Sequence, residues 1–167
     1  MDRAELWIKK LKLAPHPEGG WYKESYRSEE NISQQALPDR FSGSRSFSTA
    51  IYFLLNGNDF SAFHKIKQDE TWHFYDGSTL LLHIINDRKK YFSIKIGNDP
   101  HVDALPQYTV PAGCLFAAEV FDKKYFSLVG CSVAPGFDFA DFEMPKREDL
   151  LKKYPQHRSI ILELSRM

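Results

Sequence analysis

The sequence has few cysteines, no excess of charge and no long apolar run, and each shortage excludes a class of protein. Its 167 residues include two cysteines, and 22 Lys and Arg balance 22 Asp and Glu. Proteins that bind nucleic acids usually carry a basic excess, so neither DNA nor RNA is an expected partner. The longest apolar run, 50–55, is far shorter than the roughly 20 residues that cross a bilayer, so no membrane partner is expected.

The N-terminus and the two thiols indicate the compartment. Asp2 and Glu5 stand where a secretory leader would begin, and no apolar leader segment follows them. Cys114 and Cys131 lack the Cys-x-x-Cys spacing, and two buried, reduced thiols are typical of a cytoplasmic protein. We therefore expect a cytoplasmic location.

What the sequence does contain is a β-rich middle between helical ends. Aromatic residues make up 14% of the chain, which suits sheets and pockets better than a helical bundle. Short β-type runs follow one another between turn residues without intervening helices, which predicts an antiparallel sandwich or barrel. The length fits a single domain, 1–167, with a barrel core over about 21–134. The predicted strands cover 21–28, 47–55, 60–67, 70–76, 79–86, 91–97, 106–110, 114–120 and 125–134.

Helices are predicted at both ends of the chain. Asp2 and Glu5 have the spacing of a capping box, followed by apolar residues at helical intervals. The C-terminal extension, about 145–165, begins at Pro145 with a helix over 146–153. Its last segment, about 157–165, is amphipathic, and the pattern fits a helix and a strand equally.

Turn residues set the expected register of the strands. Asn56-Gly57 predicts a type I′ hairpin, and Asp76-Gly77 predicts a second hairpin. The segment 29–46 is a long polar loop, which in a compact domain is expected to be mobile or functional.

One neighbourhood concentrates titratable side chains around a predicted strand pair. Because side chains alternate between the faces of a strand, His64 and Ile66 are expected to face inward from one strand. Glu70 and Trp72 face inward from the next strand by the same rule. His73 then faces away from them.

The spacing in this neighbourhood resembles the first signature of the cupin superfamily, G-x5-H-x-H-x3-E-x6-G. His64 stands at the first His, Glu70 at the Glu and Gly77 at the closing Gly, while Ile66 occupies the second His position. The second signature, G-x5-P-x-G-x2-H-x3-N, is matched by Pro-Ala-Gly at 111–113, with Leu105, Phe116 and Val120 at its Gly, His and Asn positions.

Three longer stretches carry the resemblance over residues 10–165. They are HPEGGWY at 16–22, TAIYFLL at 49–55 and VAPGFDFADFE at 133–143. Together they resemble a cupin branch classed as a domain of unknown function and related in fold to dTDP-sugar epimerases. The resemblance implies an all-β fold, a double-stranded β-helix (jelly-roll barrel) with short N- and C-terminal helices. It also implies a homodimer with a pocket in the barrel mouth.

By the same resemblance, the metal ligands to look for in this chain are the three His and one Glu with which a metal-binding cupin typically holds its ion. Ile66 and Phe116 fill two of these four positions and cannot ligate, so no metal cofactor is predicted. The alternative is a divalent metal held by His64, Glu70 and His73, which requires a β-bulge or similar shift that turns His73 inward.

The residues that remain predict an apolar and aromatic pocket around one imidazole and one carboxylate, which is typical of a small-molecule site. His64 and Glu70 are the predicted catalytic pair, because the carboxylate favours the protonated imidazole whereas burial opposes it, which poises the pair near neutral pH. They predict a metal-independent isomerase or epimerase that removes a proton beside a carbonyl of a sugar-like or partly apolar ligand. The predicted ligand contacts, with the tyrosines as candidate partner acids, are Tyr22, Glu24, Tyr26, Tyr52, Ile66, Trp72, Phe74 and Phe116.

Two alternative functions remain open at this point. One is a non-catalytic ligand-binding or sensing cupin, and the other is a metal-dependent cupin oxygenase or isomerase. Three further features have structural interpretations. His16 is expected to shape the turn that follows it, Glu24 and Arg27 to form a cross-strand ion pair, and the acidic run 138–143 to border the C-terminal helix.

Overall fold

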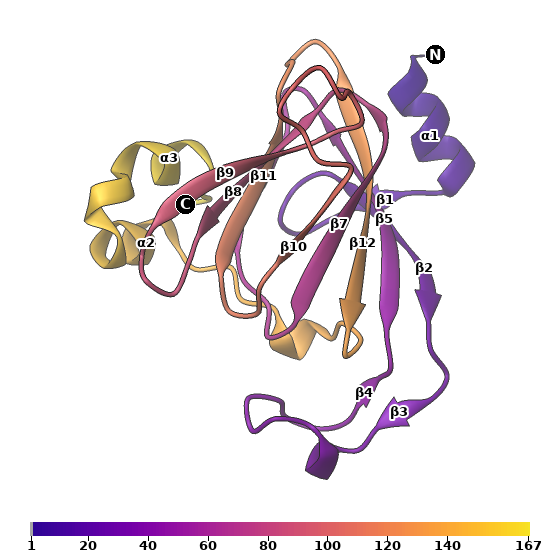
Figure 1. Cartoon of the computed structure of the whole chain (residues 1–167), viewed down its shortest axis with the longest axis vertical. Coiled ribbons are helices and arrows are strands. Elements are labelled where there is room, and N and C mark those ends of the chain that lie inside the picture. Colours follow the sequence, from indigo (N-terminus) through magenta and orange to yellow (C-terminus); the bar gives the residue numbers. More distant parts are fainter. Residues whose placement is uncertain (1) are drawn as a thin grey trace.

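The protein, described here over residues 2–167 of a computed structural model, is built from two antiparallel sheets (Figure 1). In spatial order the larger sheet contains β1 (Ala14–Pro15), β2 (Trp21–Arg27), β5 (Thr49–Asn56), β12 (Phe126–Ala134), β7 (Asp69–Gly77) and β10 (Gln107–Val110). The smaller sheet contains β6 (Phe60–His64), β11 (Leu115–Val120), β8 (Leu80–Ile85) and β9 (Tyr91–Ile96). The predicted all-β jelly roll with short terminal helices is confirmed.

The core of the barrel follows from the alternation of side chains along these strands. Inward-facing residues of both sheets form one cluster, in which Trp72 and Phe116 are each only 1% exposed. Burial of an aromatic or branched side chain of this size contributes about 1.5–3 kcal/mol. The observed strands lie close to the predicted ones, although β6 ends at His64 rather than at 67.

The predicted turns lie where the chain reverses direction, but the two strands that each turn joins do not pair with each other. Asn56-Gly57 joins β5 to β6, and Asp76-Gly77 joins β7 to β8, and in both cases the two strands belong to different sheets. Gly57 does not adopt the positive φ that a type I′ turn requires. The two hairpin predictions are therefore wrong, because a jelly roll passes the chain from one sheet to the other at such turns.

Helix α1 (Arg3–Leu11) begins with the predicted capping box. The Glu5 backbone N–H donates to the Asp2 carboxylate at 2.8 Å, and the Asp2 N–H donates to the Glu5 carboxylate at 3.1 Å. The helix packs on the outer face of the larger sheet, where Trp7 lies against a cluster that contains Leu54 and Leu128.

Helices α2 (Arg147–Lys153) and α3 (Arg158–Glu163), joined by η3 (Pro155–His157), cover the outer face of the smaller sheet (Figure 1). Leu150 and Ile161 pack there against Ile85 and Leu115. The segment 157–165, open between helix and strand from its pattern, is thus mainly helical. None of the helices within residues 2–167 has the length and apolar character needed to span a bilayer.

Residues 29–46, which we name the arm, project beyond one end of the barrel (Figure 1). The arm contains β3 (Asn31–Ile32), η1 (Gln34–Ala36) and β4 (Arg45–Ser46), and β3 pairs with β4. The acidic run 138–143 does not border α2 as expected. It forms η2 (Phe139–Asp141), capped by Asp138, and Asp141 bonds to Arg45 of the arm.

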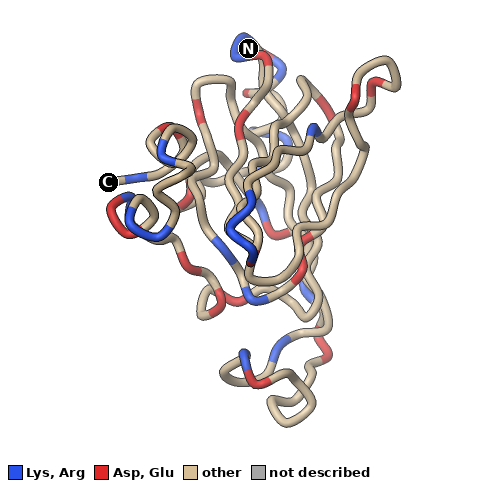
Figure 2. Tube along the Cα trace, turned by 60° about the vertical axis from the view of Figure 1, so that its left-hand side comes forward, with Lys and Arg blue, Asp and Glu red and all other residues tan. Residues whose placement is uncertain are grey.

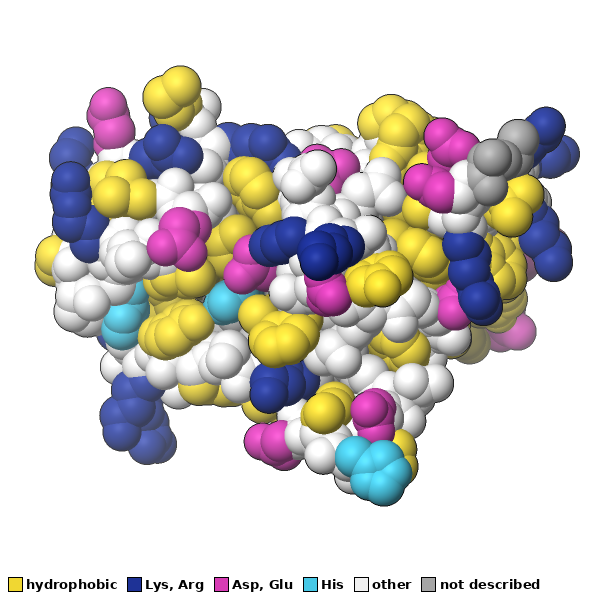
Figure 3. Space-filling view, turned by 90° about the horizontal axis from the view of Figure 1, so that it is seen from above, with side chains coloured by type: hydrophobic (Ala, Val, Ile, Leu, Met, Phe, Trp, Pro, Cys, Tyr) yellow, Lys and Arg dark blue, Asp and Glu magenta, His cyan; other side chains and the backbone are white. Residues whose placement is uncertain are grey.

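Charge is distributed evenly over the molecule. Along the chain trace, Lys and Arg and Asp and Glu are both scattered over the helices and loops (Figure 2). On the face seen from above, positive, negative and apolar side chains are interspersed (Figure 3).

Candidate functional site

A cavity of about 600 Å³ lies at the end of the barrel from which the arm projects. The larger sheet contributes Tyr22 and Glu24 from β2, Glu70 from β7 and Cys131 from β12 to its wall, and the smaller sheet contributes His64 at the end of β6. The remaining wall is formed by the segment 137–142, which carries three phenylalanines. Alternation along the strands thus brings His64 and Glu70 into one cavity, as the sequence predicted.

The histidine of the first signature is held in an ion pair that the sequence analysis missed. His64 Nε2 lies 3.0 Å from Glu18 Oε2, and His64 Nδ1 lies 2.7 Å from the carbonyl oxygen of Ala62. Because both neighbours are acceptors, both ring nitrogens carry protons and the ring is an imidazolium. Burial lowers the pKa of His64, but Glu18 outweighs burial, so the pKa is raised.

Glu18 is ionised although it is only 5% exposed. Burial by itself raises the pKa of Glu18, but the charge and hydrogen bond of His64 and the Ser61 hydroxyl, which donates at 2.9 Å, lower it below its ordinary value. Gly19 and Gly20, with φ of +113° and +79°, form the turn that directs Glu18 inward. A Cβ atom on Gly19 would overlap the carbonyl of Phe60, so the turn requires glycine there.

His16 is the second imidazole in the cavity wall, and it is neutral. Its Nδ1 accepts the Glu18 backbone N–H at 3.2 Å, which leaves the ring proton on Nε2. Burial lowers the pKa of His16, the charge of His64 lowers it further, and Glu18 opposes both. In the described part of the chain no group bonds to His16 Nε2. This N–H is therefore available to a molecule in the cavity.

Glu70 is the group in the cavity that titrates near neutral pH. Burial raises the pKa of Glu70 to about 7, the nearby Glu18 charge adds to the rise, and His64 and the Cys131 thiol, which donates to the carboxylate, oppose it. A carboxyl with such a pKa takes up and releases protons at physiological pH, as a general acid or base must.

The other predicted ligand contacts divide into two groups. Tyr22, Glu24 and Ile66 lie in the cavity wall. Glu24 forms a 2.7 Å ion pair with Arg27 at the cavity rim, within one strand rather than across two strands as expected.

Five predicted contacts do not line the cavity. Tyr26 is 55% exposed on β2, beyond a register shift between Glu24 and Tyr26. Tyr52 lies on the outer face of the larger sheet, with its ring 6.0 Å from that of Tyr75, so alternation along β5 removes it as a partner acid. Trp72 and Phe116 are buried in the barrel core and the partly buried Phe74 packs against it, and none of the three lines the cavity.

A family model described as "Cupin superfamily (DUF985)" matches residues 5–145. The chain belongs to this cupin family. Protein SO0799 from Shewanella oneidensis, a crystal structure, is 39% identical with a TM-score of 0.89 over 99% of both chains. A hypothetical protein from Leishmania major is 36% identical with a TM-score of 0.88, over 99% of this chain and 100% of that one. The uncharacterized protein YML079W of Saccharomyces cerevisiae is 29% identical over a 164-residue alignment that covers 87% of this chain and 76% of that protein.

These matches confirm the family resemblance that the motifs predicted. In this cupin, however, the donor set does not fit a metal ion. Ile66 and Phe116 supply no ligand atoms, and both nitrogens of His64 are already occupied by protons. His73 faces away on β7, where its Nε2 lies 2.8 Å from the Ser132 hydroxyl, so it does not join His64 and Glu70. Across residues 2–167, His, Cys, Asp and Glu side chains nowhere gather in a group of three or more that could hold a metal ion.

The sequence analysis missed two members of the site, His16 and Glu18. It assigned His16 to the shape of a turn and gave Glu18 no role. The available signal was the Gly19-Gly20 pair directly after them, because two consecutive glycines mark a backbone that only glycine adopts easily. Such a turn often directs the preceding side chain into a structure rather than along its surface.

Proposed function

We propose that this cupin binds a small, sugar-like or partly apolar molecule in the cavity and isomerises or epimerises it without a metal. The observation that carries the proposal is Glu70, a buried carboxyl of the cavity wall with a pKa of about 7, in the same cavity as the free N–H of His16. A base and an acid of this kind are what proton transfer at a carbon beside a carbonyl requires.

Each group in the cavity has one role in this reaction. The Glu70 carboxylate takes the proton from the carbon, and the electron pair of that C–H bond moves into an enolate. His16 Nε2–H gives its proton to the opposite face of the same carbon, where the enolate electron pair forms the new C–H bond, and the neutral ring is left as an imidazolate that water reprotonates. No oxidant or reductant is needed, and the two residues exchange their protons with water before the next turnover.

His64 has a different role from the one expected from its sequence. Both of its ring nitrogens donate to protein oxygens, so the ring cannot act as a base. Its positive charge instead holds Glu18 ionised and favours negative charge in the cavity. We therefore assign His64 as a positioning residue and Glu70 and His16 as the catalytic residues.

The aromatic residues around His16 support a sugar-like or partly apolar ligand. Phe139 lies at the cavity with 52% of its surface exposed, and Tyr22 and Phe142 lie beside it around the ring of His16. Exposed aromatic faces over a few polar groups are characteristic of small-molecule sites. The rim cation Arg27 is already bonded to Glu24 and to the carbonyl of Phe137, which favours an uncharged ligand.

The test begins with native mass spectrometry of the purified protein to identify a bound compound. Neutral aldoses and ketoses, together with any compound found, are then incubated with the protein in D2O. Proton NMR follows the loss of the C–H signal beside the carbonyl. Wild-type protein is expected to exchange this proton, Glu70→Gln to exchange it at least about 100-fold more slowly, and ligand binding to change by less than about threefold. His16→Gln is expected to retain exchange but to lose formation of the epimer. Exchange by Glu70→Gln at the wild-type rate would contradict the proposal.

A second candidate function is a non-catalytic binding or sensing cupin. It is favoured by the Glu18–His64 pair, which is buried and fully bonded and therefore contributes no free acid or base. In that case the protein binds a compound but exchanges no proton in any member of the panel.

We also infer a homodimer and a cytoplasmic location. The outer face of the larger sheet carries uncharged groups around Tyr75, which is 50% exposed, with Tyr52, His73 and Ser132 beside it. Such a face suits contact with a second copy, and neither a nucleic acid nor a membrane is proposed as a partner. Light scattering that shows a monomer at micromolar concentration would remove the dimer. Imaging of a tagged chain tests the location, which the free thiols Cys114 and Cys131 support.

A further inference from the structure

We infer that the buried Arg45–Asp141 ion pair positions the aromatic wall of the cavity, residues 137–142, and thereby controls how freely small molecules enter it. This gives the arm a function, since it carries Arg45 but contributes no residue to the cavity lining. The inference goes beyond the proposed reaction, because it holds whether the cavity catalyses or only binds.

The ion pair is buried, and every guanidinium nitrogen and both carboxylate oxygens form hydrogen bonds. Arg45 Nε and Nη2 donate to the two oxygens of Asp141, each at 2.7 Å, and the two side chains are 4% and 0% exposed. The remaining nitrogen, Nη1, donates to three backbone carbonyls of the arm, those of Ser42, Gly43 and Ser44. Gln68 Nε2 donates to Asp141 as well, at 2.7 Å. A planar guanidinium held at all three of its nitrogens fixes direction as well as distance.

The position of Asp141 connects this pair to the cavity. Asp141 ends η2, and its chain neighbours Phe139 and Phe142 lie in the cavity wall. The Phe142 ring lies 5.4 Å from the ring of His64 and 6.2 Å from that of His16. Whatever fixes Asp141 therefore fixes the rings that lie against the candidate catalytic groups.

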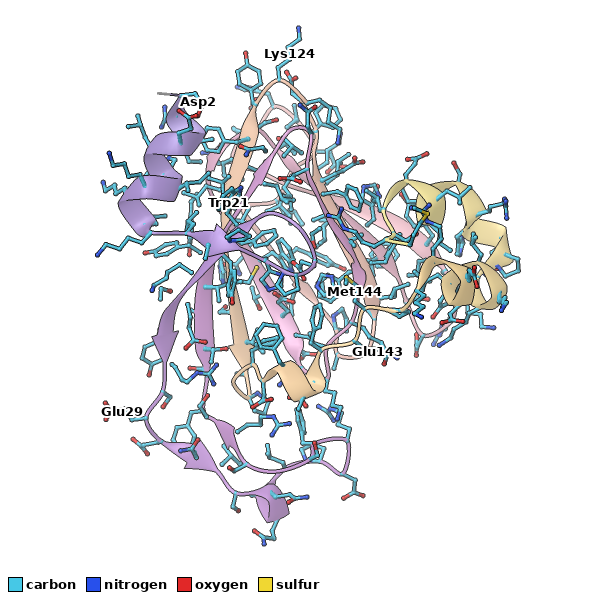
Figure 4. The ribbon with its side chains drawn as sticks, turned by 180° about the vertical axis from the view of Figure 1, so that it is seen from behind. Asp2, Trp21, Glu29, Lys124, Glu143 and Met144 are labelled. Atoms are coloured by element: carbon cyan, nitrogen blue, oxygen red, sulfur yellow. The ribbon has the colours of Figure 1, made fainter. Side chains whose placement is uncertain are left out.

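Burial of the rings does not by itself hold this wall in place. Phe139 is 52% exposed, and its neighbours Phe137 and Phe142 are only partly buried. The backbone is held instead by polar bonds to the base of the arm and to β5. The Gly136 N–H donates to the Ser46 carbonyl at 2.7 Å, and the Phe137 N–H donates to the Thr49 hydroxyl at 2.9 Å. Arg27 Nη2 also donates to the Phe137 carbonyl at 3.0 Å, from the exposed rim. Arg45–Asp141 is the buried ion pair of this set. Figure 4 labels Glu29, where the chain enters the arm, and Glu143, directly after the aromatic wall.

The chain contains its own reporters of entry into the cavity. Cys131 lies in the cavity wall and is 2% exposed. Cys114 is 7% exposed and lies outside this cavity, beside Arg88 and Pro111. Cys131 also borders a hollow on the outer face of the larger sheet, beside Tyr75 and Ser132. The aromatic wall borders the cavity route and not the outer one, so a faster rate of modification by a small neutral thiol reagent at Cys131 in an arm variant reports entry through the cavity. The reagent reaches Cys114 without passing the aromatic wall.

The experiment measures modification of both thiols by methyl methanethiosulfonate at pH 8, with peptide mass spectrometry giving a rate for each cysteine. Arg45→Met is expected to speed modification of Cys131 by about tenfold or more and to change Cys114 by less than about twofold, because loss of the pair frees the wall locally. Arg45→Lys keeps the charge but loses the two-pronged contact, so an increase of about threefold is expected at Cys131 alone. Arg40→Met is the matched control. Arg40 lies in the same arm, and within residues 2–167 its contacts are a hydrogen bond to the Lys67 carbonyl and a cation–π contact with the Phe41 ring. This variant is expected to leave both rates unchanged.

Two results would overturn the inference. One is an unchanged rate at Cys131 in Arg45→Met, and the other is an equal increase at both cysteines, which would show general loosening of the fold. If Arg45→Met does not fold, Arg45→Lys decides by the same comparison. Failure of the proposed reaction is seen separately, as absence of deuterium exchange, and does not alter these rates.

Discussion

Two clusters of buried charge lie next to each other at the arm end of the barrel, and they differ in what they leave unbonded. In the cluster around Arg45 and Asp141, every charged group is paired. In the cavity cluster, Glu18 and His64 pair with each other, but among residues 2–167 Glu70 has no ion-pair partner and the Nε2–H of His16 has no acceptor. Complete pairing fixes geometry, whereas incomplete pairing leaves groups that titrate and react.

The largest expected effect comes from breaking the complete cluster. Asp141→Ala leaves the Arg45 charge buried without its partner, so we expect the free energy of unfolding to fall by about 3–5 kcal/mol. Urea denaturation followed by circular dichroism measures it. The control is Glu24→Gln at the rim, where the pair with Arg27 is about two-fifths exposed, and a change of about 0.5 kcal/mol or less is expected there. Equal losses in the two variants would show that burial and pairing do not distinguish these charges.

In the cavity cluster, removing a charge is expected to stabilise the protein rather than destabilise it. The pKa of Glu70 rises from 4.5 to about 7 on folding, so the folded state holds a proton that the unfolded state releases. Wild-type stability therefore falls as pH increases from about 4.5 through 7, by up to about 3 kcal/mol. Glu70→Gln removes this dependence, and we expect it to be more stable than wild type at pH 8 and similar to it at pH 5. Urea titrations at the two pH values measure the difference. A variant that is less stable than wild type at pH 8 would contradict the assignment of Glu70 as an uncompensated carboxyl.

The Glu18–His64 pair gives a spectroscopic test of the same comparison. Because the pKa of His64 is raised in the folded state, its contribution to stability is present below about 6.5 and lost as pH rises through the raised value. Glu18→Gln removes the main charge that favours the imidazolium, so burial dominates and the pKa of His64 should fall below 6.5. Imidazole 15N NMR as a function of pH measures this directly. Glu70→Gln serves as the control and should lower the pKa of His64 less, because Glu18 exerts the larger effect.

The fold could be predicted from the sequence because its signals are local. Strand alternation and turn residues placed all nine predicted strands, and they placed Glu70 and Trp72 on the inner face and His73 on the outer face. The pairing of strands could not be predicted in the same way. A dipeptide such as Asn56-Gly57 reports that the chain reverses, but not which sheet receives the next strand.

The candidate site was only half predictable for a related reason. His64 and Glu70 stand on strands, where alternation determines the direction of a side chain. His16 and Glu18 stand in a loop between β1 and β2, where direction depends on the backbone angles of Gly19 and Gly20. Arg45 and Asp141 are 96 residues apart, and no local pattern joins them.

The smallest expected effect tests the alternation itself. His73→Gln changes an imidazole on the outer face of β7, where its only recorded partner among residues 2–167 is the Ser132 hydroxyl. Gln retains hydrogen-bonding capacity, so we expect the free energy of unfolding to change by about 0.5 kcal/mol or less and proton exchange in the cavity to stay at the wild-type rate. His16→Gln makes the same chemical change inside the cavity and is expected to abolish epimer formation. An equal loss of reaction in His73→Gln and His16→Gln would contradict this expectation. It would mean that the face of β7 on which a histidine lies does not determine whether it takes part.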